Sequence, residues 1–290
     1  MAEADPASLR AKSYSELDPL YIELDKDHVR RSRNIRLIPA EMHRRGGGKY
    51  SYAEWAHVIG VFQTLLYLHL DKKHDNVILD AGCGTGLMAI ASEGFLGQRG
   101  SYIGIDVCLD DIEFCRSYYD PAQFSFLHLD TSNAMYAPSR RADKGRWDVH
   151  DNTVDMVTAI SLWTHLNESD ARHYFGEIGR VLKPGGKAMI TFFFLDALYA
   201  ASLPLRGAAQ GRFHSTMQDR WIFDQPSYGS DAWFHPRWAN VPENAIGLTR
   251  EGLERLLDAS GMRETAYYPG NWKEIPGVFF QDVLVLQKTG

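Results

Sequence analysis

The segment VILDAGCGTGLMAI, residues 77–90, constrains the fold of this chain more than any other feature. An apolar run ends at Asp80, and three glycines follow within five positions, at Gly82, Gly84 and Gly86. A buried strand, a glycine-rich turn and an apolar helix in this order place backbone amides and a helix N-terminus against a ligand. The segment therefore predicts a ligand-binding turn in an α/β domain.

The spacing of the glycines distinguishes between the ligands that such a turn can bind. The dinucleotide fingerprint GxGxxG requires a third glycine where this chain has Leu87. A phosphate-binding P-loop requires Gly-Lys followed by Ser or Thr, which the segment lacks. The spacing GxGxG after an acid therefore disfavours both phosphate-type ligands, and with them a nicotinamide-dependent dehydrogenase.

Strand-like and helix-like segments alternate from residue 77 to about residue 194. Near-continuous apolar strands that alternate with helices predict a parallel sheet covered on both faces. The expected strands are 76–82, 101–107, 122–130, 152–161 and 187–194, and the expected helices are 86–97, 109–119 and 167–182, with a turn at the KPGG of 183–186.

The regions on either side of this alternation have a different texture. Residues 1–70 are charged, with apolar residues at helical spacing near their end, and predict an N-terminal helical cap segment before a domain over 71–290. Residues 195–247 form a long aromatic insertion, which we expect to be a lid or substrate-binding element. A helix and two strands that could form an antiparallel edge are predicted at 249–262, 263–270 and 278–288.

Composition excludes several classes of protein. The chain of 290 residues has a net charge of −6, which argues against a nucleic-acid partner, although the basic cluster HVRRSRNIR at 28–36 keeps an RNA substrate open. Its three cysteines are too few for a disulfide framework or a zinc site. No signal peptide and no apolar stretch of about 18 residues is visible, so no membrane span is expected and the cytoplasm is the predicted location.

The motif LDAGCGTG at 79–86 resembles motif I of the class I S-adenosylmethionine-dependent methyltransferases. The resemblance continues in register through YIGIDV at 102–107, FLHLD at 126–130, VDMVTAISLWTHL at 154–166 and EIGRVLKPGGKAMIT at 177–191. It implies a Rossmann-like fold: a mostly parallel, seven-stranded sheet with helices on both faces and an antiparallel C-terminal edge. It also implies S-adenosylmethionine as the cofactor.

The same resemblance assigns residues to parts of the cofactor. Asp80 matches the acid at the methionine end, Asp106 the acid that accepts the ribose hydroxyls, and Asp130 the acid that meets the adenine amino group. Ordinary turn chemistry is the alternative for Asp130. The full predicted cofactor set is Asp80, Gly82, Cys83, Gly84, Thr85, Gly86, Asp106, Val107, Asp130, Thr131 and Ser161.

The loop SLWTH, residues 161–165, follows the fourth predicted strand, and the resemblance implies that a base beside the methyl group comes from this loop. It lacks the Pro-Pro segment of methyltransferases that modify nucleic-acid bases, and it resembles a bacterial subgroup associated with small molecules, glycans and natural products. We predict that His165 is the general base, because histidine accepts a proton near neutral pH. A histidine that caps the next helix or binds a backbone carbonyl is the alternative.

The predicted activity is O-methylation of a small molecule or of a sugar or glycan hydroxyl. Transfer to nitrogen or sulfur, an RNA acceptor, and a non-catalytic cofactor-binding partner subunit stay open, as does a homodimer. No metal is predicted, since His214, Asp224 and His235 of the insertion lack decisive ligand spacing. Aromatic faces pack against the C–H surface of a sugar ring, and the predicted substrate residues are Trp163, Trp221, Trp233 and His235.

Overall fold

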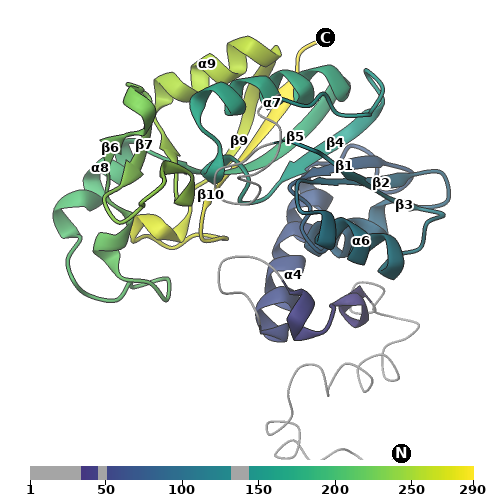
Figure 1. Ribbon diagram of the computed structural model, residues 1–290, viewed down its shortest axis with the longest axis horizontal. Coiled ribbons are helices and arrows are strands. Elements are labelled where there is room, and N and C mark those ends of the chain that lie inside the picture. Colours follow the sequence, from purple (N-terminus) through teal and green to yellow (C-terminus); the bar gives the residue numbers. More distant parts are fainter. Residues whose placement is uncertain (1–33, 45–50, 132–143) are drawn as a thin grey trace, which may run out of the picture.

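A single twisted sheet organises the molecule, which a computed structural model describes for residues 34–44, 51–131 and 144–290 (Figure 1). Within these residues the sheet has ten strands, of which five lie in the order β3-β2-β1-β4-β5. Strands β10 and β9 follow β5 along one edge. Strands β8, β7 and β6 continue the sheet from the last residues of β5. The strands are β1 (Val77–Ala81), β2 (Ser101–Asp106), β3 (Phe124–His128), β4 (Val154–Ala159), β5 (Leu182–Phe194), β6 (Phe223–Pro226), β7 (Trp233–Pro236), β8 (Gly247–Leu248), β9 (Met262–Tyr268) and β10 (Asp282–Lys288).

Helices cover both faces of this sheet (Figure 1). The α-helices are α4 (Tyr52–His69), α5 (Leu87–Ser92), α6 (Leu109–Tyr118), α7 (Glu168–Val181), α8 (Ala197–Ser202) and α9 (Arg250–Ser260). The short 3-10 helices are η1 (Asn34–Leu37), η2 (Glu41–His43), η3 (Glu93–Phe95), η4 (Trp163–His165), η5 (Leu203–Leu205), η6 (Gln218–Trp221), η7 (Ser227–Gly229), η8 (Pro242–Asn244) and η9 (Asn271–Lys273).

The alternation of side chains along each strand divides the core into two layers. In β1, Leu79 packs in the cluster that α7 and α9 cover, while Ile78 packs in the cluster that α4, α5 and α6 cover. Phe62 of α4 is fully buried in this second cluster. The helix predicted as part of an N-terminal cap therefore shares its core with the sheet, whereas residues 1–33, which include most of the basic cluster, lie outside the described residues.

The predicted architecture is confirmed. Strands β1 to β5 pair in parallel, and β10 and β9 add the predicted antiparallel edge. The turn expected at 183–186 is instead an irregularity within β5: Val154 pairs with Leu182 and Met156 with Lys187, so four residues of β5 are accommodated without partners in β4. Gly185, with φ of +77°, supplies the left-handed conformation that this bulge requires.

The aromatic insertion is more regular than its sequence indicates. It contains α8 and the short strands β6, β7 and β8, and β8 pairs with Phe193 and Phe194 of β5 just beyond the point where β4 has ended. The insertion thus continues the sheet by three strands, so the seven expected strands become ten in the described residues. The alternation of apolar and polar residues identifies only longer strands, so it did not predict these three.

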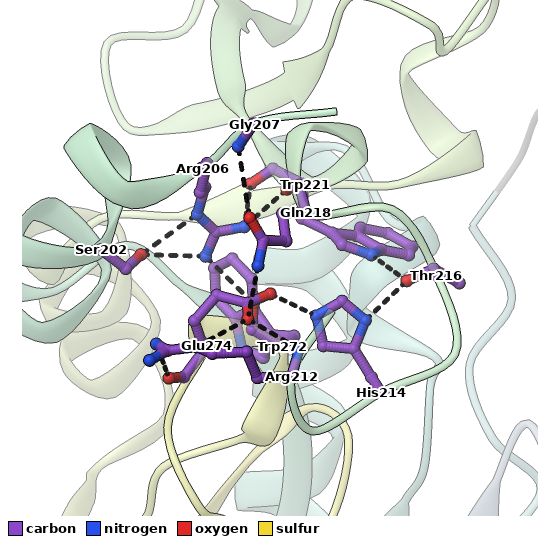
Figure 2. Close-up of polar contacts among 10 residues, drawn as sticks. All are labelled: Ser202, Arg206, Gly207, Arg212, His214, Thr216, Gln218, Trp221, Trp272 and Glu274. Carbon is purple, nitrogen blue, oxygen red and sulfur yellow. Dashed lines mark hydrogen bonds and ion pairs between the residues drawn. The ribbon is translucent and has the colours of Figure 1, made fainter. Parts of the chain in front are cut away.

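A buried polar network fastens the insertion to the loop after β9 (Figure 2). Glu274 is 2% exposed, and its carboxylate accepts hydrogen bonds from the ring of His214 at 2.8 Å and from the amide of Arg212 at 3.0 Å. The Thr216 hydroxyl contacts the other ring nitrogen of His214 and accepts a bond from the indole of Trp221. These partners of Glu274 lie on one segment, 207–221, which is thereby held against the body of the domain.

Candidate functional site

The glycine turn connects β1 to α5 at the carboxyl end of the sheet. The amides of Gly82 and Cys83 both donate to the carbonyl of Ile105, which fixes the turn on β2. Gly86 has φ of +92°, and a Cβ atom there would lie 2.5 Å from the hydroxyl of Tyr119. Any other residue would be strained and would collide, so the packing of Tyr119 accounts for this glycine independently of a ligand.

Asp80 lies at the end of β1 and is 2% exposed. One carboxylate oxygen accepts a hydrogen bond from the hydroxyl of Tyr102 at 2.7 Å, and the other accepts one from Thr158 at 2.8 Å. Burial raises the pKa of Asp80 to about 7, against the effect of these two donors. Its carboxyl group is thus rigidly placed beneath the turn, and no cation among the described residues pairs with it.

Asp106 ends β2 beside the turn. Its carboxylate accepts hydrogen bonds from the amide of Gly84 at 2.8 Å and from the amide of Cys108 at 2.9 Å. Burial raises the pKa of Asp106, and these amide donors act in the opposite direction. A buried and a half-buried acid, Asp80 and Asp106, without a cationic partner in the described part of the chain form a suitable environment for a ligand that carries positive charge.

The N-terminal segment covers this turn from outside. The Thr85 hydroxyl donates to the carbonyl of His43 at 2.5 Å, and the ring of His43 stacks on Phe114 of α6 at a centroid distance of 4.2 Å. Helix η2 therefore lies against both the glycine turn and α6. The sequence predicted an N-terminal helical cap segment over 1–70 but did not single out His43.

The remaining predicted cofactor residues lie in the glycine turn and after the ends of β2 and β3. Cys83 is 5% exposed, and burial raises the pKa of its thiol well above the usual value. The carbonyl of Val107 contacts the ring of His128 at 3.2 Å. Asp130 is exposed and Thr131 is buried, both immediately after β3. The structure thus brings the predicted set to one end of the sheet, and the contact of each residue with a cofactor stays a prediction.

Ser161 follows β4 in a left-handed conformation, with φ of +60°, that is uncommon for a residue other than glycine. Its amide donates to the hydroxyl of Thr191 at 2.7 Å, and its own hydroxyl donates to the side-chain oxygen of Gln281 at 3.0 Å. Thr191 also donates to this oxygen, at 2.7 Å. Thr191 of β5 and Gln281, the residue before β10, therefore hold Ser161 in a strained geometry, which is a feature of functional sites.

His165 is half-buried at the end of η4, and its Nδ1 atom lies 2.7 Å from the carbonyl oxygen of Glu243. A carbonyl oxygen accepts only, so Nδ1 carries the proton and Nε2 of the neutral ring bears the lone pair. Burial lowers the pKa of His165, against the effect of this carbonyl, and favours the neutral ring. The alternative role, binding a backbone carbonyl, is thus present, and it fixes the tautomer that a base at Nε2 requires.

The four predicted substrate residues occupy separate places. Trp163 and Trp233 are each 1% exposed in the core under α7 and α9, and Trp221 is 8% exposed in a third cluster. His235 is half-buried in β7, with Nδ1 3.1 Å from the carbonyl of Pro236. The structure does not gather them around one opening, and their contact with an acceptor stays a prediction.

Several residues that order the site were not predicted. Tyr102 and Thr158 fix Asp80, and Glu243 fixes His165. A threonine within the apolar strand 154–159 is a signal that could have been read, whereas a carbonyl contact such as that of Glu243 leaves no trace in the sequence. Over the described residues no cluster of three or more ligating side chains could hold a metal ion.

A second buried charge cluster lies where β5 ends beside β10. Lys273 is fully buried, with its amine 2.9 Å from Asp196 and 2.8 Å from Asp282. Asp282 also accepts bonds from the amide of Gly270 and the indole of Trp272. This cluster fixes the loop that carries Gln281.

Comparison with known proteins bears on this arrangement. Residues 78–186 match the family model described as a methyltransferase domain. A demethylmenaquinone methyltransferase of Bacillus cereus is 32% identical over 120 residues, which are 41% of this chain and 46% of that relative. The chain thus spans about half the length of the curated relatives it matches.

Solved structures show the same fold. A SAM-dependent methyltransferase from Methanosarcina mazei superimposes with a TM-score of 0.51 at 18% identity, over 78% of this chain and 97% of that one. One from Mesorhizobium loti gives a TM-score of 0.51 at 15% identity, over 79% and 98%. The order of the strands, with the antiparallel edge beside β5, is thus that of the Rossmann-like class I methyltransferase fold.

The family match lies within β1 to β5, so these strands carry the similarity to methyltransferase domains. The predicted class of enzyme and its cofactor, S-adenosylmethionine, are confirmed at this level. Over the described residues no helix is long and apolar enough to cross a lipid bilayer.

Proposed function

We propose that this protein transfers a methyl group from S-adenosylmethionine to a hydroxyl group of a small molecule or glycan. The observation that carries the proposal is the contact of His165 Nδ1 with the Glu243 carbonyl at 2.7 Å, because it sets the ring to accept a proton at Nε2. A hydroxyl acceptor needs such a base. A thiolate or a neutral amine depends on a base less.

The residues of the glycine turn fit the cofactor that the domain class implies. Asp80 and Asp106 are the acids that would hold its methionine and ribose parts, and Ser161, two residues after β4, would also contact the cofactor. When bound, S-adenosylmethionine supplies a methyl group activated by its sulfonium. The task of the chain is therefore to position the acceptor and to remove a proton.

His165 would take the hydroxyl proton at Nε2 as the acceptor oxygen bonds to the methyl carbon and the carbon–sulfur bond breaks. Its protonated ring would then release the proton to solvent. The lowered pKa of His165 suits this role, since the ring is neutral at the start and returns the proton readily.

Two measurements test the proposal. Calorimetry with S-adenosylmethionine should show binding at micromolar to millimolar concentration, and its absence at millimolar cofactor would remove the cofactor assignment. A screen of hydroxylated compounds, amines, thiols and RNA for release of S-adenosylhomocysteine then identifies the acceptor. Turnover with only amines, thiols or RNA would contradict O-methylation, and binding without any turnover would favour a non-catalytic partner subunit.

A further inference from the structure

A polar hollow of about 660 Å³ lies between the start of α7 and the turn at 227–230. Helix α7 begins at Glu168, two residues after Leu166, and thus directly follows the loop that carries His165. The hollow therefore opens at the carboxyl end of the sheet, the end that holds the glycine turn. Its lining includes Asn167, Glu168, Arg172, Ser227, Tyr228 and Ser230.

Glu243 joins this hollow to the candidate base. The backbone oxygen of Glu243 contacts His165, and its buried carboxylate accepts the hydroxyl of Tyr228, with oxygens at 2.8 and 3.0 Å. The amide of Asn167 approaches the same carboxylate at 3.4 Å. One residue thus fixes both the ring that would accept a proton and the aromatic wall of the hollow.

Tyr228 presents its ring to the outside in a conformation that needs support. The side chain is among the exposed large hydrophobic groups, at 66%, and its backbone has φ of +52°, which is rare for a residue with a Cβ atom. Such a conformation persists only where the surroundings impose it. The bond to Glu243 holds the hydroxyl end of the side chain, so an exposed aromatic face is kept in one place.

The polar groups of the lining suit neutral hydroxyls better than an anion. Ser227 is 2% exposed, and its hydroxyl has no hydrogen-bond partner among the described residues. Arg172 is an exposed donor in the lining, while Glu168, bonded to Ser230 and to Arg255, is an acceptor there. A carboxylate and hydroxyls beside one guanidinium disfavour a polyanion and match a ligand that both donates and accepts.

We propose that this hollow is the acceptor subsite for a pyranose ring, with the sugar packed on the face of Tyr228. Aromatic rings present an apolar face at low entropic cost, and the surrounding donors and acceptors bind the ring hydroxyls. This inference rests on the proposed O-methyltransferase function and specifies its acceptor class. One hydroxyl of the sugar, or of a unit linked to it, would then lie toward His165.

Binding can be tested without turnover. Saturation-transfer NMR with the full chain, S-adenosylhomocysteine and a series of methyl glycosides (glucoside, galactoside, mannoside, rhamnoside and N-acetylglucosaminide) should show transfer to at least one sugar. Tyr228→Ala should reduce this transfer at least fivefold, and Tyr228→Phe, which keeps the ring but loses the bond to Glu243, should retain more of it than Tyr228→Ala. Arg237→Ala, in a separate hollow near Trp238, is the matched control and should have no effect.

Arg172→Ala provides a second variant at an exposed position, which should fold normally and weaken transfer severalfold. No saturation transfer from any glycoside, or equal transfer with Tyr228→Ala and Arg172→Ala as with the original chain, would overturn the subsite. Calorimetry with S-adenosylmethionine on the same samples keeps the two proposals apart. Cofactor binding without glycoside binding rejects the subsite alone, whereas loss of cofactor binding rejects the proposed function.

Discussion

Ser161 and Gln281 are joined by a 3.0 Å hydrogen bond across 120 residues of sequence. The Gln281 side-chain oxygen also accepts the hydroxyl of Thr191, so it is the common acceptor of two buried or half-buried hydroxyls. Through this oxygen the start of β10 determines the conformation of the residue that follows β4. The loop that carries His165 is therefore stabilised from the far end of the chain.

Replacing Gln281 with Leu should leave both hydroxyls without an acceptor. We expect the variant to lose about 1–3 kcal/mol of unfolding free energy, the cost of unsatisfied buried polar groups, and to slow methyl transfer. Gln281→Glu keeps an acceptor oxygen and should retain more of both than Gln281→Leu. Urea denaturation and the rate of S-adenosylhomocysteine release measure the two effects, and equal behaviour of the two variants would show that the shared acceptor is unimportant.

His165→Gln should reduce kcat/KM by a factor of about 10²–10⁴, the usual contribution of a general base, while the dissociation constant of S-adenosylmethionine stays within about twofold. The folded pKa of His165 is below 6.5, so the rate of the original chain should fall only as the pH drops below that value. This acidic limb should be absent in the variant. His173→Gln, a histidine on α7 that also contacts a backbone carbonyl, is the control. An unchanged rate would remove the base assignment.

The sheet and the glycine turn were predictable because each depends on local pattern: near-continuous apolar strands, helices between them, and a turn too crowded for side chains. The insertion was not, since β8 has only two residues and is a strand only because β5 extends beyond β4. The tryptophans could not be placed either. The sequence does not show whether a tryptophan such as Trp233 lies in a core or in a binding site. The packing of α9 against Trp233 places it in the core.

Asp80 should make stability depend on pH in an unusual direction. Its pKa is about 7 in the folded chain and near 3.8 when unfolded, so between these values the folded state holds the extra proton. The unfolding free energy should therefore fall as the pH rises from about 4 to 7, by up to about 4 kcal/mol, and then become constant. Asp80→Asn should lose this slope, whereas Asp110→Asn, at an exposed position, should keep it. Urea denaturation at pH 5 and pH 8 measures the difference.

Cofactor binding should reveal the same group. A ligand that carries positive charge near Asp80 favours the ionised carboxylate, so binding of S-adenosylmethionine near pH 6.5 should release a proton. Calorimetry in two buffers of different ionisation enthalpy counts that proton. Asp80→Asn should release none, and equal release from both proteins would assign the proton to another group.

Glu274 should control the attachment of the insertion. Glu274→Ala leaves the buried ring of His214 and the amide of Arg212 without their acceptor, and breaking such a network costs about 3–5 kcal/mol. Since Arg212 and Arg220 are exposed in the fastened segment, its release should make both positions better sites for trypsin. Glu264→Ala, which removes only a surface partner of Arg250, should cost less than about 1 kcal/mol and leave cleavage unchanged.

Limited proteolysis followed by mass spectrometry therefore separates local release from global unfolding. Early cleavage after Arg212 and Arg220, with the sheet intact by circular dichroism, is the expected result for Glu274→Ala. Cleavage spread over the whole chain would mean that the network supports the fold as a unit. Cleavage at the original rate would show that the segment is held by the packing of Trp221 against Phe193, with Glu274 contributing little.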